Sequence, residues 1–222
     1  TNNQIADIAS IAKSFGCLVI VDAVSSLTAM SVEVDKWGLD VVVSGSQKGW
    51  MMAPGLAFIS ISEEAWDIQK KCTTPRFYFD LLKHKASLAN GQTPWTPAVS
   101  LFYQLETALK DIKKEGMNNI FARHAFCAEK TRSSIKEMGF DLLADEGYES
   151  NSVTAIKAPD DLNVAQLLKV ARTKYNTIFA GGQGSLGGKI FRFGHLGYVN
   201  ENDIDMGLDA LKSSLNEIGF RK

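Results

Sequence analysis

Residues 17–26, CLVIVDAVSS, form an apolar run that a single aspartate interrupts before the closing serines. Runs of this kind are typical of strands buried on both faces, as in the parallel sheets of α/β proteins. An amphipathic helix is predicted directly before the run, because apolar residues recur at helical spacing from Ile5 to Ala12 and Gly16 provides a suitable end. A helix that leads into a doubly buried strand needs neighbouring strands. We therefore expect an α/β sheet, and we expect that residues belonging before Thr1 are missing.

The rest of the chain continues this alternation, first densely and then in a smaller second part. Further strands are predicted at Val41–Ser44, Leu56–Ile61, Val153–Lys157, Ile178–Ala180 and Ile190–Phe193. Further helices are predicted to start at Ser62 as an N-cap and to cover Ala98–Lys114, Asn118–Met138, Val164–Lys174 and Glu201–Ile218. These elements indicate a large α/β domain over residues 1–120 that includes a long connecting helix, and a small α+β domain over residues 121–222.

Composition narrows the class of protein. Hydrophobic residues make up 45% and charged residues 22% of the 222 residues, which is typical of a globular protein with a sizeable core. The formal net charge of -1 gives no electrostatic reason to expect nucleic acid or an anionic membrane as a partner. No apolar stretch approaches the roughly 20 residues of a spanning helix. Cys17, Cys72 and Cys127 are widely separated, so we expect neither structural zinc nor a disulfide framework, and a cytoplasmic location.

The segment SGSQKGW, residues 44–50, places Lys48 among small and polar residues directly after a predicted buried strand. Asp22 ends the preceding predicted strand, and α/β sheets present ligands at this carboxyl edge. Asp22 alone is equally well interpreted as a helix N-cap or turn residue, and the two residues together as a simple ion pair. A cofactor clamp is the sharper interpretation: pyridoxal phosphate needs a lysine amine and a carboxylate beside its ring nitrogen. The serines and Gln47 could then hydrogen-bond the phosphate or a ring substituent.

Other motifs carry less weight. Residues 182–187, GQGSLG, satisfy the dinucleotide pattern GxGxxG, but they lead into a strand instead of the helix that this motif requires. His84, His124 and His195 lack metal-ligand spacing, and a turn or packing role is favoured for His195. We also expect Trp50 and its neighbours to serve the core.

Four blocks together carry a family resemblance: VDAVSSL, VVVSGSQKGWMMAPG, TPWTP and GKIFRFGHLG. In this order and spacing they resemble the class V, fold-type I pyridoxal-phosphate aminotransferases, in particular the alanine/serine–glyoxylate (serine–pyruvate) group. The resemblance spans nearly the whole chain. It implies the C-terminal part of a fold-type I large domain, with a mainly parallel sheet, followed by a small α+β domain.

The resemblance also implies roles for the residues at the predicted sheet edge. Lys48 matches the lysine that forms the Schiff base with pyridoxal phosphate. Asp22 matches the partner of the pyridinium nitrogen, and Val24 the residue that packs on one face of the ring. Gln47 matches a hydrogen-bond donor to the cofactor phosphate.

Two more residues are implied from later blocks. Thr96 matches a threonine that reaches the cofactor phosphate of the neighbouring subunit, so the resemblance implies a homodimer with a shared site. Arg192 matches the arginine that binds the substrate α-carboxylate, a task suited to the bidentate guanidinium. Taken without the resemblance, an arginine between two phenylalanines on a strand is more often solvent-facing, because strand residues alternate.

The implied reaction is transfer of an amino group from alanine, serine or aspartate to a 2-oxo acid such as glyoxylate or pyruvate, in a ping-pong Schiff-base cycle. The family's N-terminal part supplies further cofactor contacts, so a separate N-terminal segment is an expected partner. Two alternatives stay open. One is a cysteine desulfurase-like or other pyridoxal-phosphate lyase, although Cys72 and Cys127 do not lie in a Gly/Ser-rich loop. The other is a non-catalytic fragment or subunit of a larger complex.

Overall fold

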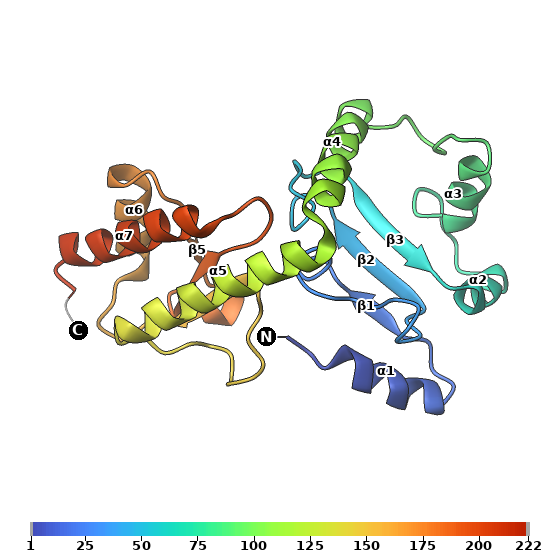
Figure 1. Ribbon diagram of the computed structural model, residues 1–222. Helices are drawn as coiled ribbons and strands as arrows, with labels where there is room; N and C mark the ends of the chain where they lie inside the picture. The colour runs from blue at the N-terminus through green and yellow to red at the C-terminus, as the bar shows by residue number, and fades with distance from the viewer. Residues whose placement is uncertain (1, 221–222) are drawn as a thin grey trace. The chain divides into compact units, whose positions relative to one another are not determined.

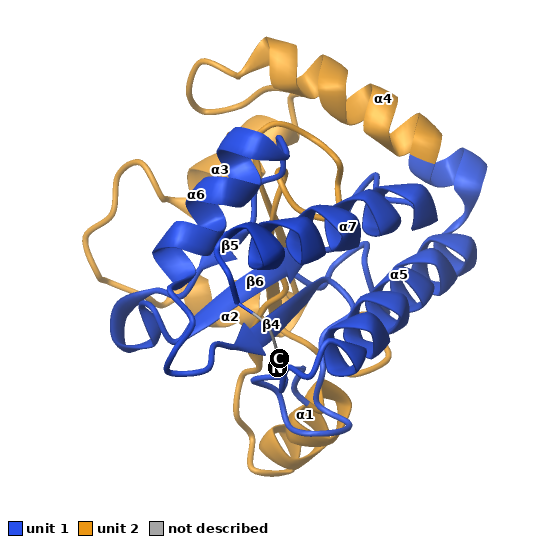
Figure 2. Cartoon of the chain, turned by 90° about the vertical axis from the view of Figure 1, so that its left-hand side faces the viewer, with its two compact units in different colours: residues 1–3, 25–31, 112–222 blue, residues 4–24, 32–111 orange. Residues whose placement is uncertain are grey.

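The computed structural model describes residues 2–220 and divides the chain into two compact units, which are coloured separately in Figure 2. Residues 4–24 and 32–111 form one unit, called here the lysine unit because it contains Lys48. Residues 1–3, 25–31 and 112–222 form the other, called the arginine unit because it contains Arg192. Each unit has its own sheet, and each is described by itself.

The lysine unit begins with the predicted helix and strand. The expectation that this strand is buried on both faces is wrong, because Ile20 is 69% exposed and Val21 alone of its three residues is buried. Helix α1 (Ile5–Ser14) ends where Gly16, at φ +69°, donates its N–H to the carbonyl of Lys13. Strand β1 (Ile20–Asp22) then pairs in parallel with β2 (Val41–Gly45). Strand β3 (Ala57–Ile61) pairs with the other side of β2, giving the order β1-β2-β3 (Figure 1). The α/β prediction is confirmed. The β2–β3 pair, however, is antiparallel, so this described sheet is mixed.

Buried Asp40 ties the start of β2 to its surroundings. Its carboxylate accepts hydrogen bonds from Lys13 Nζ at 2.8 Å, from the Val19 amide at 2.8 Å and from the Ser62 hydroxyl at 2.9 Å. These three bonds offset the cost of burying the charge. Burial alone would raise the pKa of Asp40, but the hydrogen bonds from Lys13, Val19 and Ser62 outweigh it and hold the pKa below its usual value. The network therefore fixes α1, β1 and β2 around one anionic centre.

Three further helices belong wholly or largely to the lysine unit. Helix α2 (Glu63–Lys70) starts at Ser62, whose hydroxyl accepts the Ala65 N–H as predicted. Helix α3 (Leu81–Leu88) was not predicted, and it contains no buried residue. Helix α4 (Val99–Glu115) is the predicted long helix, and its last residues belong to the arginine unit.

The arginine unit contains a three-stranded antiparallel sheet in the order β4-β6-β5. Its strands are β4 (Val153–Lys157), β5 (Ala180–Gly181) and β6 (Ile190–Gly194). Helices α5 (Met117–Glu137), α6 (Val164–Lys174) and α7 (Glu201–Glu217) lie together over one face of this sheet in Figure 2. The shared core includes Ile135, Ile156, Leu167, Phe191, Phe193, Ile204 and Leu211. Across the described part of the chain, no helix is long and apolar enough to cross a membrane.

Candidate functional site

The structure brings Asp22 and Lys48 to the same edge of the sheet in the lysine unit. Asp22 is the last residue of β1, and it lies opposite Val43 in the parallel register with β2. Strand β2 ends two residues later, at Gly45, and Lys48 follows in the next turn. Both side chains therefore follow the carboxyl ends of neighbouring parallel strands, which is where α/β sheets bind ligands.

The charges of Asp22 and Lys48 are not joined by an ion pair in the described residues. Asp22 is exposed, and one of its carboxylate oxygens, Oδ1, accepts the Val24 N–H at 2.9 Å. The turn-residue interpretation is thus confirmed for that oxygen, and the simple ion-pair interpretation is wrong. Lys48 is half-buried, and within residues 2–220 its ammonium has no hydrogen-bond or ion-pair partner. The carboxylate therefore keeps one oxygen, and the lysine its amine, available to a ligand.

Ser46 holds the loop that carries Lys48. Its buried hydroxyl donates to the carbonyl of Ala53 at 2.8 Å and accepts the Leu56 N–H at 3.1 Å. The Ser46 N–H donates to the Leu56 carbonyl at 3.0 Å, and Met51 adopts φ +63° to close the turn. Ser46, at the start of the loop that carries Lys48, therefore bonds to residues at the end of that loop and closes it.

This arrangement corrects one expectation about the serines. Buried Ser44 accepts a hydrogen bond from Trp50 Nε1 at 2.9 Å, and Ser46 is engaged as described. Neither hydroxyl is available to a phosphate or a ring substituent, because both are buried and used to fold the loop. Trp50 also packs on Phe58, with ring centroids 4.3 Å apart, but it is half-buried and not part of the buried core.

Gly45 brings two of the predicted cofactor residues together. A Cβ atom at Gly45 would lie 3.0 Å from Gln47 Oε1 and 3.7 Å from Val24 Cγ1. The side chains of Val24 and Gln47 therefore lie over the same glycine, one apolar and one an amide. Any larger residue at position 45 would occupy this space. An apolar side chain, an amide, and a lysine and a carboxylate at the same sheet edge are groups that fit a flat, phosphorylated pyridine cofactor.

Arg192 lies on β6 of the arginine unit, between two buried phenylalanines. Phe191 and Phe193 face the core, whereas Arg192 is half-buried on the opposite face. Its Nε–H donates to the carbonyl of Gly181 on β5 at 3.0 Å. Its two terminal nitrogens have no partner among the described residues, so they are free to form a bidentate pair with a carboxylate.

Gly181 was not singled out from the sequence, because a backbone carbonyl leaves no residue-type signal. The glycine that follows it is sterically required: a Cβ at Gly182 would lie 2.0 Å from the carbonyl oxygen of Leu186. The glycine-rich loop thus holds the Gly181 carbonyl against the arginine and ends in strand β6, as expected for a segment that is not a dinucleotide motif.

Thr96 is exposed in the segment before α4. The neighbouring Trp95 stacks on Tyr78 with centroids 5.5 Å apart, and its indole N–H donates to the Tyr78 carbonyl at 3.3 Å. Phe77 packs on the same indole, at 5.0 Å. No contact links Thr96 to Lys48 within the part of the chain described, so the structure does not bring Thr96 to the Gly45 cluster.

The two buried histidines are structural. His195 is fully buried, with Nδ1 3.0 Å from the carbonyl of Asn151 and Nε2 2.8 Å from the Thr154 hydroxyl. Burial lowers the pKa of His195 to about 4. His124 accepts the Gly197 N–H at Nε2, at 3.0 Å, and burial lowers its pKa as well. The packing role expected for His195 is confirmed, and no three His, Cys, Asp or Glu side chains of the described residues form a group that could hold a metal ion.

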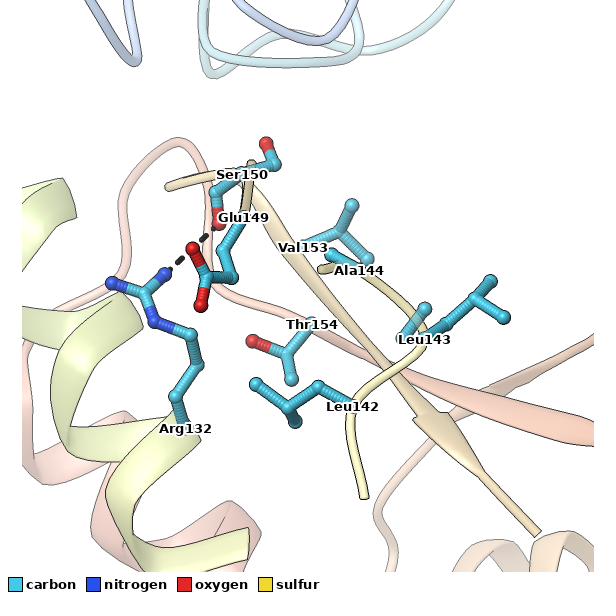
Figure 3. Close-up of a pocket in the computed structure, with 9 residues that line it drawn as sticks. Arg132, Leu142, Leu143, Ala144, Glu149, Ser150, Val153 and Thr154 are labelled. Carbon is cyan, nitrogen blue, oxygen red and sulfur yellow. Dashed lines mark hydrogen bonds between the residues drawn. The ribbon is translucent and has the colours of Figure 1, made fainter. Parts of the chain in front are cut away.

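A small hollow lies on the β4 side of the arginine unit (Figure 3). It has a volume of about 50 Å³ and is lined by residues that include Arg132, Leu142 and Thr154. Arg132 is fixed there by a hydrogen bond from Nη1 to the Ser150 carbonyl at 3.2 Å. Sites for drug-sized ligands and cofactors usually measure about 300–1,000 Å³, so this hollow is too small for a cofactor.

Lys48 and Asp22 thus follow neighbouring strands at one sheet edge of an α/β fold, which is where such folds bind ligands. The family model "Aminotransferase class-V" matches residues 1–192. The chain therefore belongs to the class V aminotransferase family, whose members depend on pyridoxal phosphate, and the resemblance seen in the sequence is confirmed.

Individual relatives carry names of two kinds, hydrogenase subunit and aminotransferase. The chain is 45% identical over 203 residues to the "Soluble hydrogenase, small subunit" of Synechococcus sp., covering 91% of this chain and 53% of that protein. It is 35% identical to the L-aspartate–glyoxylate aminotransferase of Paracoccus denitrificans, covering 91% of this chain and 52% of that protein. The crystal structure of pyridoxamine–pyruvate aminotransferase from Mesorhizobium loti matches with a TM-score of 0.94 and 31% identity, covering 99% of this chain and 57% of that one. The chain thus spans about half the length of these relatives.

Proposed function

We propose that this chain carries the lysine-bearing part of a pyridoxal-phosphate aminotransferase that moves an amino group from a small amino acid to a 2-oxo acid. The supporting observation is the cluster at Gly45. There Val24 and Gln47 lie over one glycine, and the unpaired Lys48 and the free carboxylate oxygen of Asp22 belong to the same edge of the sheet. These are the groups that hold the ring, phosphate and aldehyde of this cofactor.

Each residue of the cluster has a distinct task in this proposal. The cofactor, when bound, supplies an electron sink for the carbon that loses its proton. The amine of Lys48 holds the cofactor covalently, and once released it takes the proton from the α-carbon of the substrate at Nζ. The carboxylate of Asp22 keeps the ring nitrogen protonated. Val24 supports the ring, and the amide of Gln47 hydrogen-bonds the phosphate.

Arg192 binds the substrate in the same proposal. Its Nε is held by the Gly181 carbonyl, so the two terminal nitrogens present a fork to the α-carboxylate. Thr96 reaches the cofactor of a second copy of the chain, so the active form is a homodimer. A separate N-terminal segment completes the enclosure of the cofactor.

The substrates are proposed from the relatives' names. The Paracoccus relative is named for aspartate and glyoxylate, and the Mesorhizobium structure for pyruvate. The sequence resemblance adds alanine and serine, so we propose alanine, serine or aspartate as donor and glyoxylate or pyruvate as acceptor. The two cysteines weighed for the desulfurase alternative differ. Burial raises the pKa of Cys127, which disfavours its reactive thiolate, whereas Cys72 is exposed and hydrogen bonding with Thr74 lowers its pKa.

The non-catalytic alternative makes an opposite prediction about Lys48, so one experiment separates the two. Purified protein is incubated with pyridoxal phosphate, separated from free cofactor, and examined for a visible absorption band. The proposal expects the band in the wild-type protein and in Lys36→Ala, which removes an exposed lysine of the same unit. It expects no band in Lys48→Ala. A band that survives Lys48→Ala, or a wild-type protein without any, contradicts the proposal.

A further inference from the structure

The side chain of His195 joins the ends of strands β4 and β6. Its imidazole bonds the Asn151 carbonyl and the Thr154 hydroxyl, at 3.0 and 2.8 Å. Its backbone N–H extends the strand ladder by donating to the Ser152 carbonyl at 3.1 Å. All of these groups lie within three residues of Asn151, so one histidine binds the start of β4 at three points.

The protonation of the imidazole follows from its partners. A backbone carbonyl can only accept, so Nδ1 of His195 carries the proton and donates to Asn151. Nε2 is then an acceptor, and the Thr154 hydroxyl donates to it. Burial favours the same neutral form, because it penalises the imidazolium.

Arg192 lies next to this junction in the strand register. Arg192 is paired with Ala155, the residue that directly follows Thr154, and Phe193 is paired with Thr154 itself. The next residue of β6 is Gly194, which has no side chain to pack against either neighbour. Beyond Arg192, the side-chain anchoring of this end of β6 therefore falls to Phe193 in the core and to His195 on Thr154 and Asn151.

On the other side of β6, Arg192 has one fixed point of its own. Its Nε–H bond to the Gly181 carbonyl orients the guanidinium, and that bond depends on how β6 sits against β5. Because β5 is only two residues long, the position of β6 is set mainly by its five-residue pairing with β4. A change at the β4–β6 junction thus reaches the guanidinium through the strand that carries it.

We propose that His195 and Thr154 are a positioning pair that fixes the end of β6 and, through it, the direction in which Arg192 presents its two free nitrogens. This inference rests on the proposed function in one respect, the role of Arg192 in binding a carboxylate. The histidine and the threonine touch no substrate. They act by holding the strand.

Thr154→Val tests the pair, because it removes the hydroxyl at nearly constant volume. Thr154→Ser restores a hydroxyl and serves as the conservative rescue. Thr131→Val is the matched control: Thr131 is equally buried in the same unit, and its hydroxyl donates to the Cys127 carbonyl on α5 at 2.8 Å. Both valine variants lose one buried hydrogen bond, but only one of them loses it at the β4–β6 junction.

Two measurements are made on the full chain labelled with ¹⁵N. The first is the solvent exchange of the Arg192 Nε–H, identified by its loss in Arg192→Lys. Thr154→Val is expected to speed this exchange about tenfold over the wild-type protein, and Thr131→Val and Thr154→Ser to leave it near the wild-type rate. The second is the glyoxylate concentration at which the change in the chemical shifts of the Arg192 signals is half complete. Arg192→Lys lacks these signals, so its half-saturation is read from other signals. The half-saturating glyoxylate concentration is expected to rise about fivefold in Thr154→Val and to rise in Arg192→Lys as well. It is expected to stay near the wild-type value in Thr131→Val and Thr154→Ser.

The outcomes separate the two claims. If the Arg192 Nε–H of Thr154→Val exchanges at the wild-type rate, the proposed positioning pair is wrong, regardless of the glyoxylate result. Equal acceleration in Thr131→Val overturns it too, because the effect would then be a general loss of stability. If Arg192→Lys leaves the glyoxylate response unaltered, the carboxylate role of Arg192 fails, while the exchange data still decide the fate of the pair.

Discussion

Asp22 and Lys48 follow neighbouring parallel strands at one edge of a sheet, yet among the described residues no ion pair joins them. One carboxylate oxygen of Asp22 accepts the Val24 N–H, and the other has no partner among the described residues. Lys48 emerges from a loop that Ser46 closes with its own side chain and backbone. Both residues at this edge therefore keep a polar atom without a partner among the described residues.

The free oxygen of Asp22 can be tested without disturbing its turn. Asp22→Asn retains an oxygen that accepts the Val24 N–H, so the melting temperature should stay within a few degrees of wild type. The amide carries no charge and cannot hold a proton on a pyridine nitrogen, so kcat for amino transfer to glyoxylate should fall at least about 100-fold. Asp35→Asn, at an exposed position of the same unit, should keep wild-type turnover. Wild-type turnover in Asp22→Asn would remove Asp22 from the proposed mechanism.

Ser46 is expected to be worth more to stability than an ordinary serine. Ser46→Ala breaks two buried hydrogen bonds, to Ala53 and Leu56, and should lower the free energy of unfolding by about 1–3 kcal/mol. Ser14→Ala also removes one hydroxyl hydrogen bond, but at an exposed site of α1, and should change it by less than about 0.5 kcal/mol. Urea unfolding of the three proteins measures both values. Equal effects would mean that Ser46 does not hold the lysine loop.

Thr28 offers a gain in stability. It is a buried, β-branched residue with φ +70°, and its hydroxyl has no hydrogen-bond partner in the structure as described. Thr28→Gly relieves both costs and should raise the free energy of unfolding by about 1 kcal/mol, after the entropy lost by glycine is subtracted. Asn176→Gly is the control, because asparagine tolerates its φ of +48° far better. A fall in stability for Thr28→Gly would show that its packing outweighs its strain.

His195 should make the stability of the protein depend on pH. Burial lowers its pKa from 6.5 to about 4, and Arg132 and His124 on α5 add repulsion against the imidazolium. The unfolded chain therefore binds a proton at higher pH than the folded one. The stabilisation is complete above pH 6.5 and is lost as the pH falls through about 4.

The measurement is urea unfolding from neutral pH down to about pH 5, over which this residue should account for a loss of about 2 kcal/mol. His195→Gln removes the titrating group, so its stability should fall less steeply over this range. His84→Gln, at an exposed histidine, should follow the wild-type curve. Parallel curves for His195→Gln and the wild-type protein would contradict the depressed pKa.

Local patterns predicted much of the fold. The bounds of β4 and α6 match the predicted Val153–Lys157 and Val164–Lys174. Helix α3 was missed because none of its residues is buried, so it has no apolar period to detect. The antiparallel direction of β3 could have been predicted from the length of the connection that precedes it. The connection from Ser46 to Leu56 is shorter than the dozen or more residues that a parallel crossover needs.

The candidate site was predictable where residue type carries the chemistry. Lys48 and Asp22 were singled out because an amine and a carboxylate each have a characteristic task beside a cofactor. Arg192 was singled out through the family resemblance, and the roles of all three stay predictions. The actual use of Ser44 and Ser46 was not predictable, because their partners, Trp50, Ala53 and Leu56, are set by how the loop closes. The Gly181 carbonyl was missed for a similar reason, since every residue has one.

The closure of the lysine loop limits how the length of this segment can vary. Ser46 bonds to Ala53 and Leu56, so the segment from Ser46 to Leu56 forms a closed loop of fixed length that includes Lys48. Adding or deleting one residue there would rotate the lysine away from Asp22 even if the fold survived. We therefore expect insertions and deletions to be tolerated in the exposed segment around Gly91, but not between Lys48 and Ala53. A library of single-residue insertions, selected for cofactor retention, would map that boundary directly.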